Sequence, residues 1–491
     1  MKVSIGLLLM AMSIQVFAQK ENSNTEPYPF GNPVIKHMYT ADASPHVMPD
    51  GRVWMVTSVD LDEGGGYSTM HSYHTFSSAD MRNWTDHGEV FSIEDIAPNE
   101  NPKVDDYALW APDMVYRNGK YYLYYPVHIR HRQDLQDNGR PKVTTYIAVA
   151  VSNSPDQKFT VLKDKIEGTR GIDPSIFVDD DDEVYLYWGS HWVAKLKDNM
   201  FELATEPVKL EYGEKNFMEA PWMHKRKGKY YFNYHTKYGK PVSKENPDNI
   251  DREKSRLDYS WGDSPMGPLS YGGILNYELG YGVNEGPKYM DYDYVPWRLT
   301  QSNHGGVVTY HGKDYLFYHT SALSSWRQDC FVEEGTWTQR SVCVDEIRYN
   351  EDGSVRPVQQ TVSGVVPVKV DQPFEIKVDL TKAEISGAKL KGQELSITKN
   401  ATTIKLKDVD FGSGYYYFDL THQVKEGVKV SIRLDDVQSG YTVGTIILSE
   451  LENTTMLREA EGKHDVYITI EGAKKETLSD LRFFAGAPQK L

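Results

Sequence analysis

Three carboxylates, Asp42, Asp173 and Glu219, each stand nine residues before the turn position of a predicted hairpin. Carboxylates that meet in one pocket suit the hydrolysis of a glycosidic bond. In that reaction one acid protonates the leaving oxygen, and another carboxylate activates water or attacks the sugar carbon. A third carboxylate can orient the acid and raise its pKa. A single Asp before a strand usually caps a turn, but three at one offset favour a shared chemical role.

Two further repeats carry Trp110 and the pair Asn303-His304 at the same offset. A common offset from a common turn predicts a common place in each repeat, just upstream of the innermost strand. The five positions should therefore surround one mouth of a central channel. Clustered carboxylates repel one another, so this combination predicts a functional ring rather than a structural one.

The turns belong to a five-fold repeat in which a turn is followed by a short, aromatic-rich strand. Asp-Gly or Asn-Gly before an apolar strand is a strong hairpin signal, because a type I′ turn needs φ > 0 at both central residues. An apolar run also precedes each turn, and the chain between units is long enough to complete four-stranded blades. We predict an all-β chain with a five-bladed β-propeller, which closes by radial repetition. The repeats are residues 50–56, 118–124, 181–187, 227–233 and 311–317.

Other polar clusters receive non-catalytic interpretations. The acidic run at residues 179–182 coincides with a hairpin turn and is interpreted as solvated. Asp60 and Asp62 stand beside three glycines and are interpreted as part of a mobile loop. His128 and His131 are assigned to the surface or the rim of the site.

Length, charge and composition bound the remaining functions. The 491 residues suit two domains, and a hydrophobic content of 39% is that of a globular chain. A net charge of −16 makes nucleic acid an unfavourable partner. Neither a CxxC nor an HExxH spacing occurs, which argues against a zinc site. Cys330 and Cys343 are either a disulfide or two buried thiols, and the oligomeric state is open.

The N-terminus has the pattern of an export signal. Lys2 supplies a positive start, residues 3–17 are apolar, and residues 16–18 offer a small-residue cleavage pattern. We therefore predict a signal peptide at residues 1–18 and a secreted or periplasmic protein. No later apolar run approaches the ~18–20 residues that span a bilayer, so no membrane partner is expected.

From about Asn32 to Val365 the chain resembles glycoside hydrolase family 43. The resemblance implies an inverting enzyme on a five-bladed propeller, here assigned to residues 28–365. Ala43 stands where Pro is commoner in the family, and Ala220 where Gly is common, but neither change removes a functional group. The matching motifs are ADASP at 41–45, WAP at 110–112, DPSIFVD at 173–179, EAPWMHK at 219–225, GDSPMGP at 262–268, NHGG at 303–306 and RSVCVD at 340–345.

The family resemblance also implies a role for each site residue. Asp42 would be the general base, Glu219 the general acid, and Asp173 would orient the acid and raise its pKa. Base and acid should then lie about 6.5–9.5 Å apart, with a water between them. His304 matches a family histidine that in some members helps to hold calcium or another ion, although the chemistry needs no cofactor. Arg340 matches an arginine that reaches the substrate pocket.

Two tryptophans are candidates for stacking on sugar C–H bonds. Trp110 is the stronger candidate, because Trp222 directly follows an active-site acid and its ring could instead point into the blade core.

A second domain is predicted at residues 374–491, where short alternating strands indicate a β-sandwich of jelly-roll type. It resembles carbohydrate-binding module family 6, whose members bind sugars on aromatic platforms and can hold a structural calcium. All ten Trp lie at or before Trp337, so sugar binding by this domain and a purely packing role both stay open.

These features predict an inverting glycoside hydrolase that acts on plant cell-wall polysaccharides. The resemblance favours an α-L-arabinofuranosidase that removes arabinose from arabinoxylan or arabinan. The alternatives are a β-xylosidase, an endo-arabinanase or, from a different class, a non-catalytic sugar-binding propeller.

Overall fold

The computed structural model confirms the all-β class. Apart from the 3₁₀ turns η2 (Ile93–Asp95) and η4 (Leu380–Lys382), its regular helix is the short α1 (Ala322–Gln328). None of the helices in the described ranges is long and apolar enough to cross a membrane. The signal predicted at residues 1–18 and Cys330 lie outside those ranges. The structure describes residues 28–62, 70–96, 107–189, 191–213, 217–237, 255–277, 302–328, 339–369, 372–373, 375–415, 417–424, 427–448, 453–457, 460–473 and 475–485.

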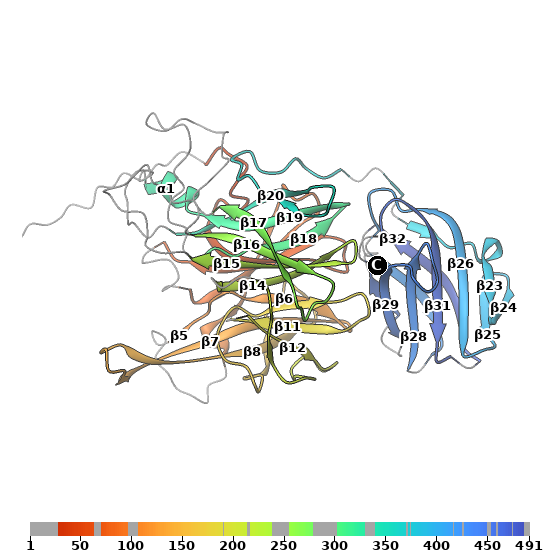
Figure 1. Ribbon diagram of the computed structural model, residues 1–491, viewed down its shortest axis with the longest axis horizontal. Helices are drawn as coiled ribbons and strands as arrows, with labels where there is room; N and C mark the ends of the chain where they lie inside the picture. Colours follow the sequence, from red (N-terminus) through yellow and green to blue (C-terminus); the bar gives the residue numbers. More distant parts are fainter. Residues whose placement is uncertain are drawn as a thin grey trace, which may run out of the picture.

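The first part of the chain forms five antiparallel sheets, each built from strands that follow one another in sequence (Figure 1). The first sheet holds β1 (Tyr39–Val47), β2 (Val53–Asp60), β3 (Ser72–Ser78) and β4 (Thr85–Ser92). The second holds β5 (Tyr107–Ala108), β6 (Asp113–Arg117), β7 (Lys120–Leu135), β8 (Pro141–Ser152) and β9 (Thr160–Lys163). The third holds β10 (Ser175–Val178), β11 (Val184–Trp188), β12 (Trp192–Leu196) and β13 (Val208–Lys209). The fourth holds β14 (Phe217–Arg226), β15 (Lys229–Lys237), β16 (Ser255–Gly262) and β17 (Ser270–Tyr277). The fifth holds β18 (Gly306–Tyr310), β19 (Lys313–Thr320), β20 (Ser341–Tyr349) and β21 (Val355–Arg356).

One strand from each sheet contacts a strand of the next sheet, and these contacts form a closed cycle. The contacts run from β1 to β6, β10, β14 and β18, and β18 contacts β1 again. The apolar side chains between neighbouring sheets form separate cores, such as the cluster of Met55, Phe76 and Phe317 between the first and fifth sheets. These five inner strands carry or directly follow the positions that the repeat singled out.

The predicted hairpin turns are of two lengths. Asn118-Gly119, Lys227-Gly228 and His311-Gly312 have φ > 0 at both residues, as a type I′ turn requires. In the first and third repeats five residues join the paired strands. They lie between the last pairs of the ladders, which are Val47 with Val53 and Val178 with Val184. Asp-Gly at the first turn therefore does not form the two-residue turn that its sequence favours.

The ring is closed by hydrogen bonds between segments far apart in the chain. The Asn32 amide donates to the Val344 carbonyl over 3.1 Å and to the Thr361 carbonyl over 2.9 Å. The amide oxygen of Asn32 accepts the Val344 N–H at 3.0 Å. These partners are more than 300 positions apart, and Asn32 is fully buried.

The second domain contains two antiparallel sheets around one apolar core that includes Phe411, Phe418 and Phe483. One sheet has the order β24-β25-β32-β27-β30, with β22 beside β32, and the other has the order β23-β26-β31-β28-β29. The strands are β22 (Glu375–Lys377), β23 (Glu384–Ser386), β24 (Ala388–Lys391), β25 (Glu394–Ile397), β26 (Ala401–Asp410), β27 (Tyr417–His422), β28 (Val428–Leu434), β29 (Thr442–Leu448), β30 (Thr454–Met456), β31 (Lys463–Glu471) and β32 (Thr477–Phe484).

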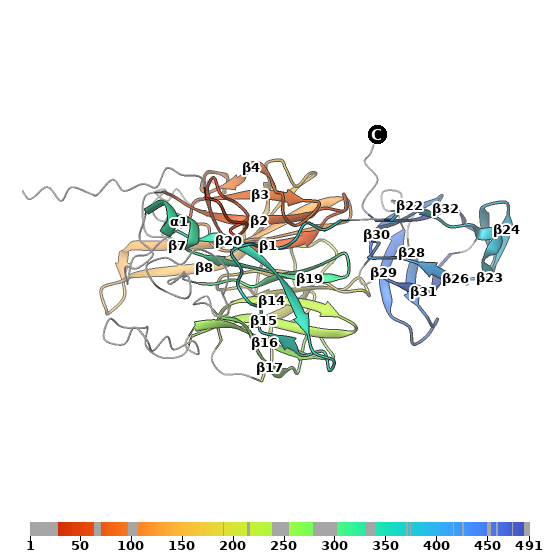
Figure 2. The ribbon, with the colours of Figure 1, turned by 90° about the horizontal axis from the view of Figure 1, so that it is seen from above.

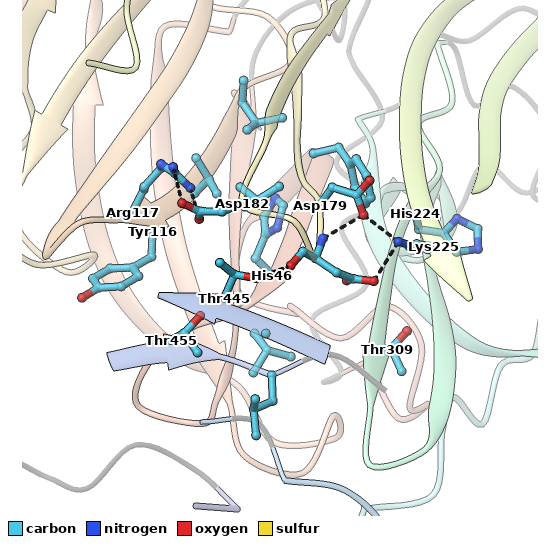
Figure 3. Close-up of a pocket in the computed structure, with 18 of the residues that line it drawn as sticks. His46, Tyr116, Arg117, Asp179, Asp182, His224, Lys225, Thr309, Thr445 and Thr455 are labelled. Carbon is cyan, nitrogen blue, oxygen red and sulfur yellow. Dashed lines mark hydrogen bonds and ion pairs between the residues drawn. The ribbon is translucent and has the colours of Figure 1, made fainter. Parts of the chain in front are cut away.

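This domain packs against the hairpin turns of the five-sheet domain (Figures 1 and 2). The Tyr441 hydroxyl donates to the Lys227 carbonyl, and the Thr445 hydroxyl donates to the Asp180 carbonyl over 2.8 Å. The interpretation of residues 179–182 as a solvated turn was wrong in part: Asp180 is 8% exposed, and the Lys225 ammonium lies 2.7 Å from its carboxylate. A cavity of about 210 Å³, drawn in Figure 3, remains between the two domains.

Candidate active site

The site lies at the ends of the inner strands that face away from the second domain. Asp42 sits in a bulge of β1, between the paired residues Ala41 and Ser44. Both Asp42 and Asp173 adopt φ = 56°, a left-handed conformation in which Asp is tolerated better than most residues. In each case the left-handed residue stands two positions before the strand resumes, at Ser44 and Ser175. These two acids therefore occupy equivalent places in their sheets, as the repeat predicts.

Glu219 does not occupy the same backbone position. In its sheet the left-handed residue is Ala220, at φ = 61°, and it stands two positions before the strand resumes at Trp222. Glu219 lies one residue earlier and pairs with His235 across the ladder. The shared offset of nine arises because the turn of this repeat is shorter. Equal spacing from the turn thus predicted which end of the strand carries Glu219. It did not predict that Ala220, rather than Glu219, holds the backbone position of Asp42 and Asp173.

Asp42 is buried and held from three sides. Its Oδ1 lies 3.0 Å from Nη1 of Arg340 and 3.0 Å from Nδ1 of His304, and its Oδ2 accepts the Ser58 hydroxyl at 2.9 Å. Burial alone would raise the pKa of Asp42, but the positive charges of Arg340 and His304 outweigh burial and hold this pKa well below its ordinary value. The Asp42 carboxylate is therefore ionised, as a general base must be.

Arg340 is also buried, with a side chain 3% exposed. Its Nε and Nη2 donate to the two carboxylate oxygens of Asp60 over 3.0 and 2.9 Å. The interpretation of Asp60 as part of a mobile loop was wrong, because this residue ends β2 and is 2% exposed. Arg340 thus contacts Asp42 and Asp60, and its role toward the substrate stays a prediction.

His304 bridges the first and third sheets. Its Nδ1 faces Asp42, and its Nε2 lies 3.6 Å from Oδ2 of Asp173. Burial alone would lower the pKa of His304, but the two carboxylates raise it well above its ordinary value. His304 thus lies between two acids that favour its protonated form.

Asp173 and Glu219 interact as a coupled pair of carboxyl groups. Burial and the charge of Glu219 raise the pKa of Asp173, although the His304 charge opposes this. Burial would also raise the pKa of Glu219, but His235, whose Nδ1 lies 3.3 Å from Oε1 of Glu219, lowers it. The Ala220 N–H donates to Asp173 over 3.1 Å and ties the two acids together. Such a pair retains one proton more readily than two isolated carboxylates would.

The two tryptophans have different environments. Trp110 is half-buried; its carbonyl accepts the Tyr73 hydroxyl, and its ring centroid lies 4.2 Å from that of His128. His128 is 6% exposed, which excludes the surface from the two places predicted for it, the surface or the rim of the site. Trp222 is 7% exposed, packs among the core residues of its sheet and donates Nε1–H to the Val307 carbonyl over 3.2 Å. That placement favours a packing role for Trp222 over sugar stacking.

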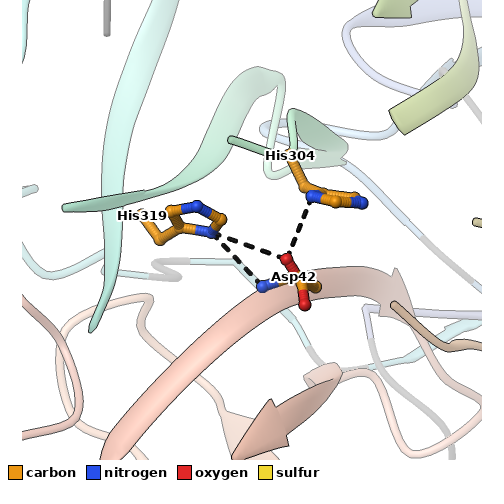
Figure 4. Close-up of side chains that lie close together, drawn as sticks. All are labelled: Asp42, His304 and His319. Carbon is orange, nitrogen blue, oxygen red and sulfur yellow. Dashed lines mark hydrogen bonds and ion pairs between the residues drawn. The ribbon is translucent and has the colours of Figure 1, made fainter. Parts of the chain in front are cut away.

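Three residues that the sequence analysis did not single out contact the acids. Ser58 contacts Asp42, and His235 contacts Glu219. Nδ1 of His319 accepts the Asp42 N–H at 3.4 Å (Figure 4). All three stand seven residues after the turn glycine of their repeat. Because antiparallel partners return to the same end of the sheet, this second offset is the signal that would have found them.

Asp42, His304 and His319 also form the one group of possible metal ligands found among the described residues. They offer one carboxylate oxygen and two ring nitrogens, whereas Ca²⁺ takes about six to eight oxygen ligands. These residues do not fit calcium, so no catalytic step is assigned to it.

Sequence relatives identify this arrangement. Residues 30–249 match the profile of glycosyl hydrolases family 43. The chain is 31% identical to a xylosidase/arabinosidase from Humicola insolens over 66% of its own length and 98% of that protein. The chain belongs to glycosyl hydrolase family 43. As a family 43 member it is an enzyme that hydrolyses O-glycosyl bonds, a chemistry that needs no cofactor.

Other family 43 proteins resemble it over different shares of the chain. An arabinoxylan arabinofuranohydrolase from Paenibacillus polymyxa is 24% identical and covers 92% of this chain and 73% of its own length. The structure of a β-xylosidase/α-arabinofuranosidase from a compost microbial metagenome, in complex with xylotriose, is 27% identical with a TM-score of 0.50. It covers 68% of this chain and 98% of its own. A Bacillus subtilis arabinoxylan arabinofuranohydrolase, at 22% identity and a TM-score of 0.52, shares the fold over 93% of this chain and 97% of its own.

Proposed function

We propose that this enzyme removes α-L-arabinofuranosyl groups from arabinoxylan or arabinan with inversion at the anomeric carbon. The observation that carries the mechanism is the placement of the acids: Asp42 is held by Arg340, His304 and Ser58, whereas Asp173 accepts the backbone N–H of Ala220, the residue beside Glu219. The observation that favours the substrate is that relatives spanning both domains of this chain are arabinoxylan arabinofuranohydrolases.

In the proposed reaction Asp42 takes a proton from a water molecule as the water oxygen bonds to the anomeric carbon. Glu219 gives its proton to the leaving oxygen, and the bond between this oxygen and the anomeric carbon breaks. His235 lowers the pKa of Glu219, so a bound sugar, which excludes water from the site, must raise this pKa before Glu219 can donate its proton.

A β-xylosidase is the second candidate, favoured by the names of other relatives: a xylosidase/arabinosidase from Bacteroides ovatus and a β-xylosidase from Xylanibacter ruminicola. Endo-arabinanase activity has weaker support, from one relative that aligns over 38% of this chain. A non-catalytic sugar-binding propeller would have no need of the three acids.

We also propose the finer architecture. The closed cycle of inner strands supports a five-bladed β-propeller. The two sheets around one core support a β-sandwich of jelly-roll type that resembles carbohydrate-binding module family 6. The predicted signal at residues 1–18 supports a secreted or periplasmic location.

The activity is tested on the nitrophenyl glycosides of α-L-arabinofuranose, β-D-xylose and β-D-galactofuranose, and then on arabinoxylan and arabinan. The arabinofuranoside should be cleaved fastest, and proton NMR should detect the inverted sugar first. Preferential cleavage of the xyloside would establish the second candidate, and a retained anomer would contradict the mechanism.

Glu219→Gln tests the acid. The amide keeps the shape of the side chain but cannot donate a proton, so we expect kcat to fall by about 10²–10⁴-fold while sugar binding survives in calorimetry. The matched control is Glu206→Gln, an exposed position that should retain full activity. Full activity of Glu219→Gln would show that another group is the acid.

A further inference from the structure

A buried aspartate lies behind the predicted base and contacts it only through an arginine. Asp60 has a fully buried side chain, and its two oxygens face the forked edge of the Arg340 guanidinium. The same carboxylate accepts the backbone N–H of Arg340 at 2.9 Å. Three hydrogen bonds thus join one acid to one residue, whose remaining nitrogen, Nη1, faces Asp42.

The fork geometry fixes the direction of this last nitrogen. A guanidinium is planar and rigid, so two parallel bonds along one edge determine where the other corner points. The Sδ of Met70, 2.8 Å from Nη2, closes a further side of the group. Arg340 therefore has little freedom to turn while Asp60 is ionised.

Asp60 also balances charge. Arg340 lies between two buried carboxylates, and a lone guanidinium in that place would leave Asp42 as its single strong partner. Asp42 would then be drawn toward Arg340 and away from Ser58, which holds its other oxygen. The Asp42 carboxylate must contact the attacking water. A displacement of about 1 Å can lower the reaction rate by about 10²-fold.

We propose that Asp60 is a positioning residue of the hydrolytic reaction, one that aims the Arg340 guanidinium at Asp42 and thereby sets the orientation of the base. This inference rests on the proposed role of Asp42. It assigns Asp60 no contact with substrate, so its removal should lower kcat and leave KM nearly unchanged.

The main test is Asp60→Asn in the full-length enzyme, assayed on the best nitrophenyl glycoside. The amide can accept one N–H but presents its own NH₂ to the guanidinium, so the fork is lost. We expect kcat to fall by about 10²-fold. The matched control is Asp62→Asn, the same change of charge at an exposed position two residues away, which should leave kcat unchanged.

A double-mutant cycle separates positioning from general damage. If Asp60 acts through the base, Asp60→Asn should change the residual rate of an Asp42→Ala enzyme by less than about twofold, because coupled effects do not add. Equal fold-losses in both backgrounds would overturn the proposal, as would a full wild-type rate in Asp60→Asn.

Two further measurements keep the result interpretable. Unfolding midpoints are recorded for each variant. If Asp60→Asn does not fold, Arg340→Lys takes its place in the double-mutant cycle. The lysine ammonium keeps the positive charge but cannot form the two parallel hydrogen bonds to Asp60. Glu219→Gln is assayed in parallel. If it matches the wild type, the proposed catalytic roles fail, whereas loss in Glu219→Gln with full activity in Asp60→Asn rejects only the positioning role.

Discussion

At the scale of single residues, the site is an alternation of charges. Asp60, Arg340, Asp42, His304 and Asp173 form a chain in which each acid contacts a cation and each cation contacts two acids. Charges of one sign would not be stable so deep in the protein, and the alternation allows a carboxylate to stay ionised without solvent. It also makes the site sensitive to the loss of any one charge.

Alkaline conditions should remove one of these charges. Because the folded state raises the pKa of His304, its stabilising contribution is fully present below about pH 6.5, the ordinary value for an unfolded histidine. It is lost as the pH rises through the higher pKa of the folded state. We therefore expect the free energy of unfolding to fall with rising pH in the alkaline range, and more steeply in the wild type than in His304→Gln. Denaturant titrations between pH 6 and 10 measure both, and equal slopes would contradict the ion-pair assignment.

The sequence predicted the acids better than it predicted their partners. Asp42, Asp173 and Glu219 could be found because they precede turns whose residues are themselves recognisable. Asp60 could not, because its role depends on Arg340, which is 280 positions away, and its own neighbours resemble a loop. Trp222 shows the converse: an aromatic residue beside an acid suggests stacking on a sugar, but only packing decides which way the ring points.

At the scale of elements, the hairpin turns do more than reverse the chain. Their φ > 0 residues set the length of each inner strand, and turns of two lengths explain why equal offsets reach non-equivalent places. Asp113, at the start of β6, shows how the strands are held together: its carboxylate accepts bonds from Ser44 and His46 of the first sheet and from the Ile176 N–H of the third. The number of sheets could be predicted from the repeat, but this joint between them could not.

Gly228 tests the link between a turn and the second domain. A Cβ at this position would lie 2.6 Å from the Tyr441 ring, whereas a Cβ at Gly119, which has nearly the same φ and the same place in its own turn, would meet nothing within 4 Å. Gly119→Ala should cost about 1 kcal/mol of unfolding free energy for the left-handed conformation alone. Gly228→Ala should cost more, because Tyr441 must also move. Denaturant unfolding compares the two variants, and equal losses would show that the Tyr441 contact contributes nothing.

At the scale of the whole molecule, the second domain covers the turn end of the five-sheet domain and leaves the acids at the other end. Its contacts there include hydrogen bonds from the Thr445 and Tyr441 hydroxyls, and a cavity remains between the domains. Alternating strands predicted further β-structure after residue 374, but not where it docks, since two of the docking hydrogen bonds end on backbone carbonyls, which carry no sequence signal.

Thr445→Val tests this separation of stability from catalysis. The change removes the hydroxyl that donates to the Asp180 carbonyl and should cost about 1 kcal/mol of unfolding free energy. Because the acids lie at the far end of the strands, kcat/KM should be unchanged. Thr421→Val, at an exposed position, is the control. A change in kcat/KM for Thr445→Val alone would indicate that the docking surface communicates with the site.

The hydrogen bonds of Asn32 have a consequence for how the chain matures. Asn32 is synthesised more than 300 residues before its partners Val344 and Thr361. Folding during synthesis can complete individual sheets, but the ring stays open until the fifth sheet has emerged, and contacts of such sequence separation form slowly. The step that locks the shape of the five-sheet domain therefore waits until nearly all of that domain is available.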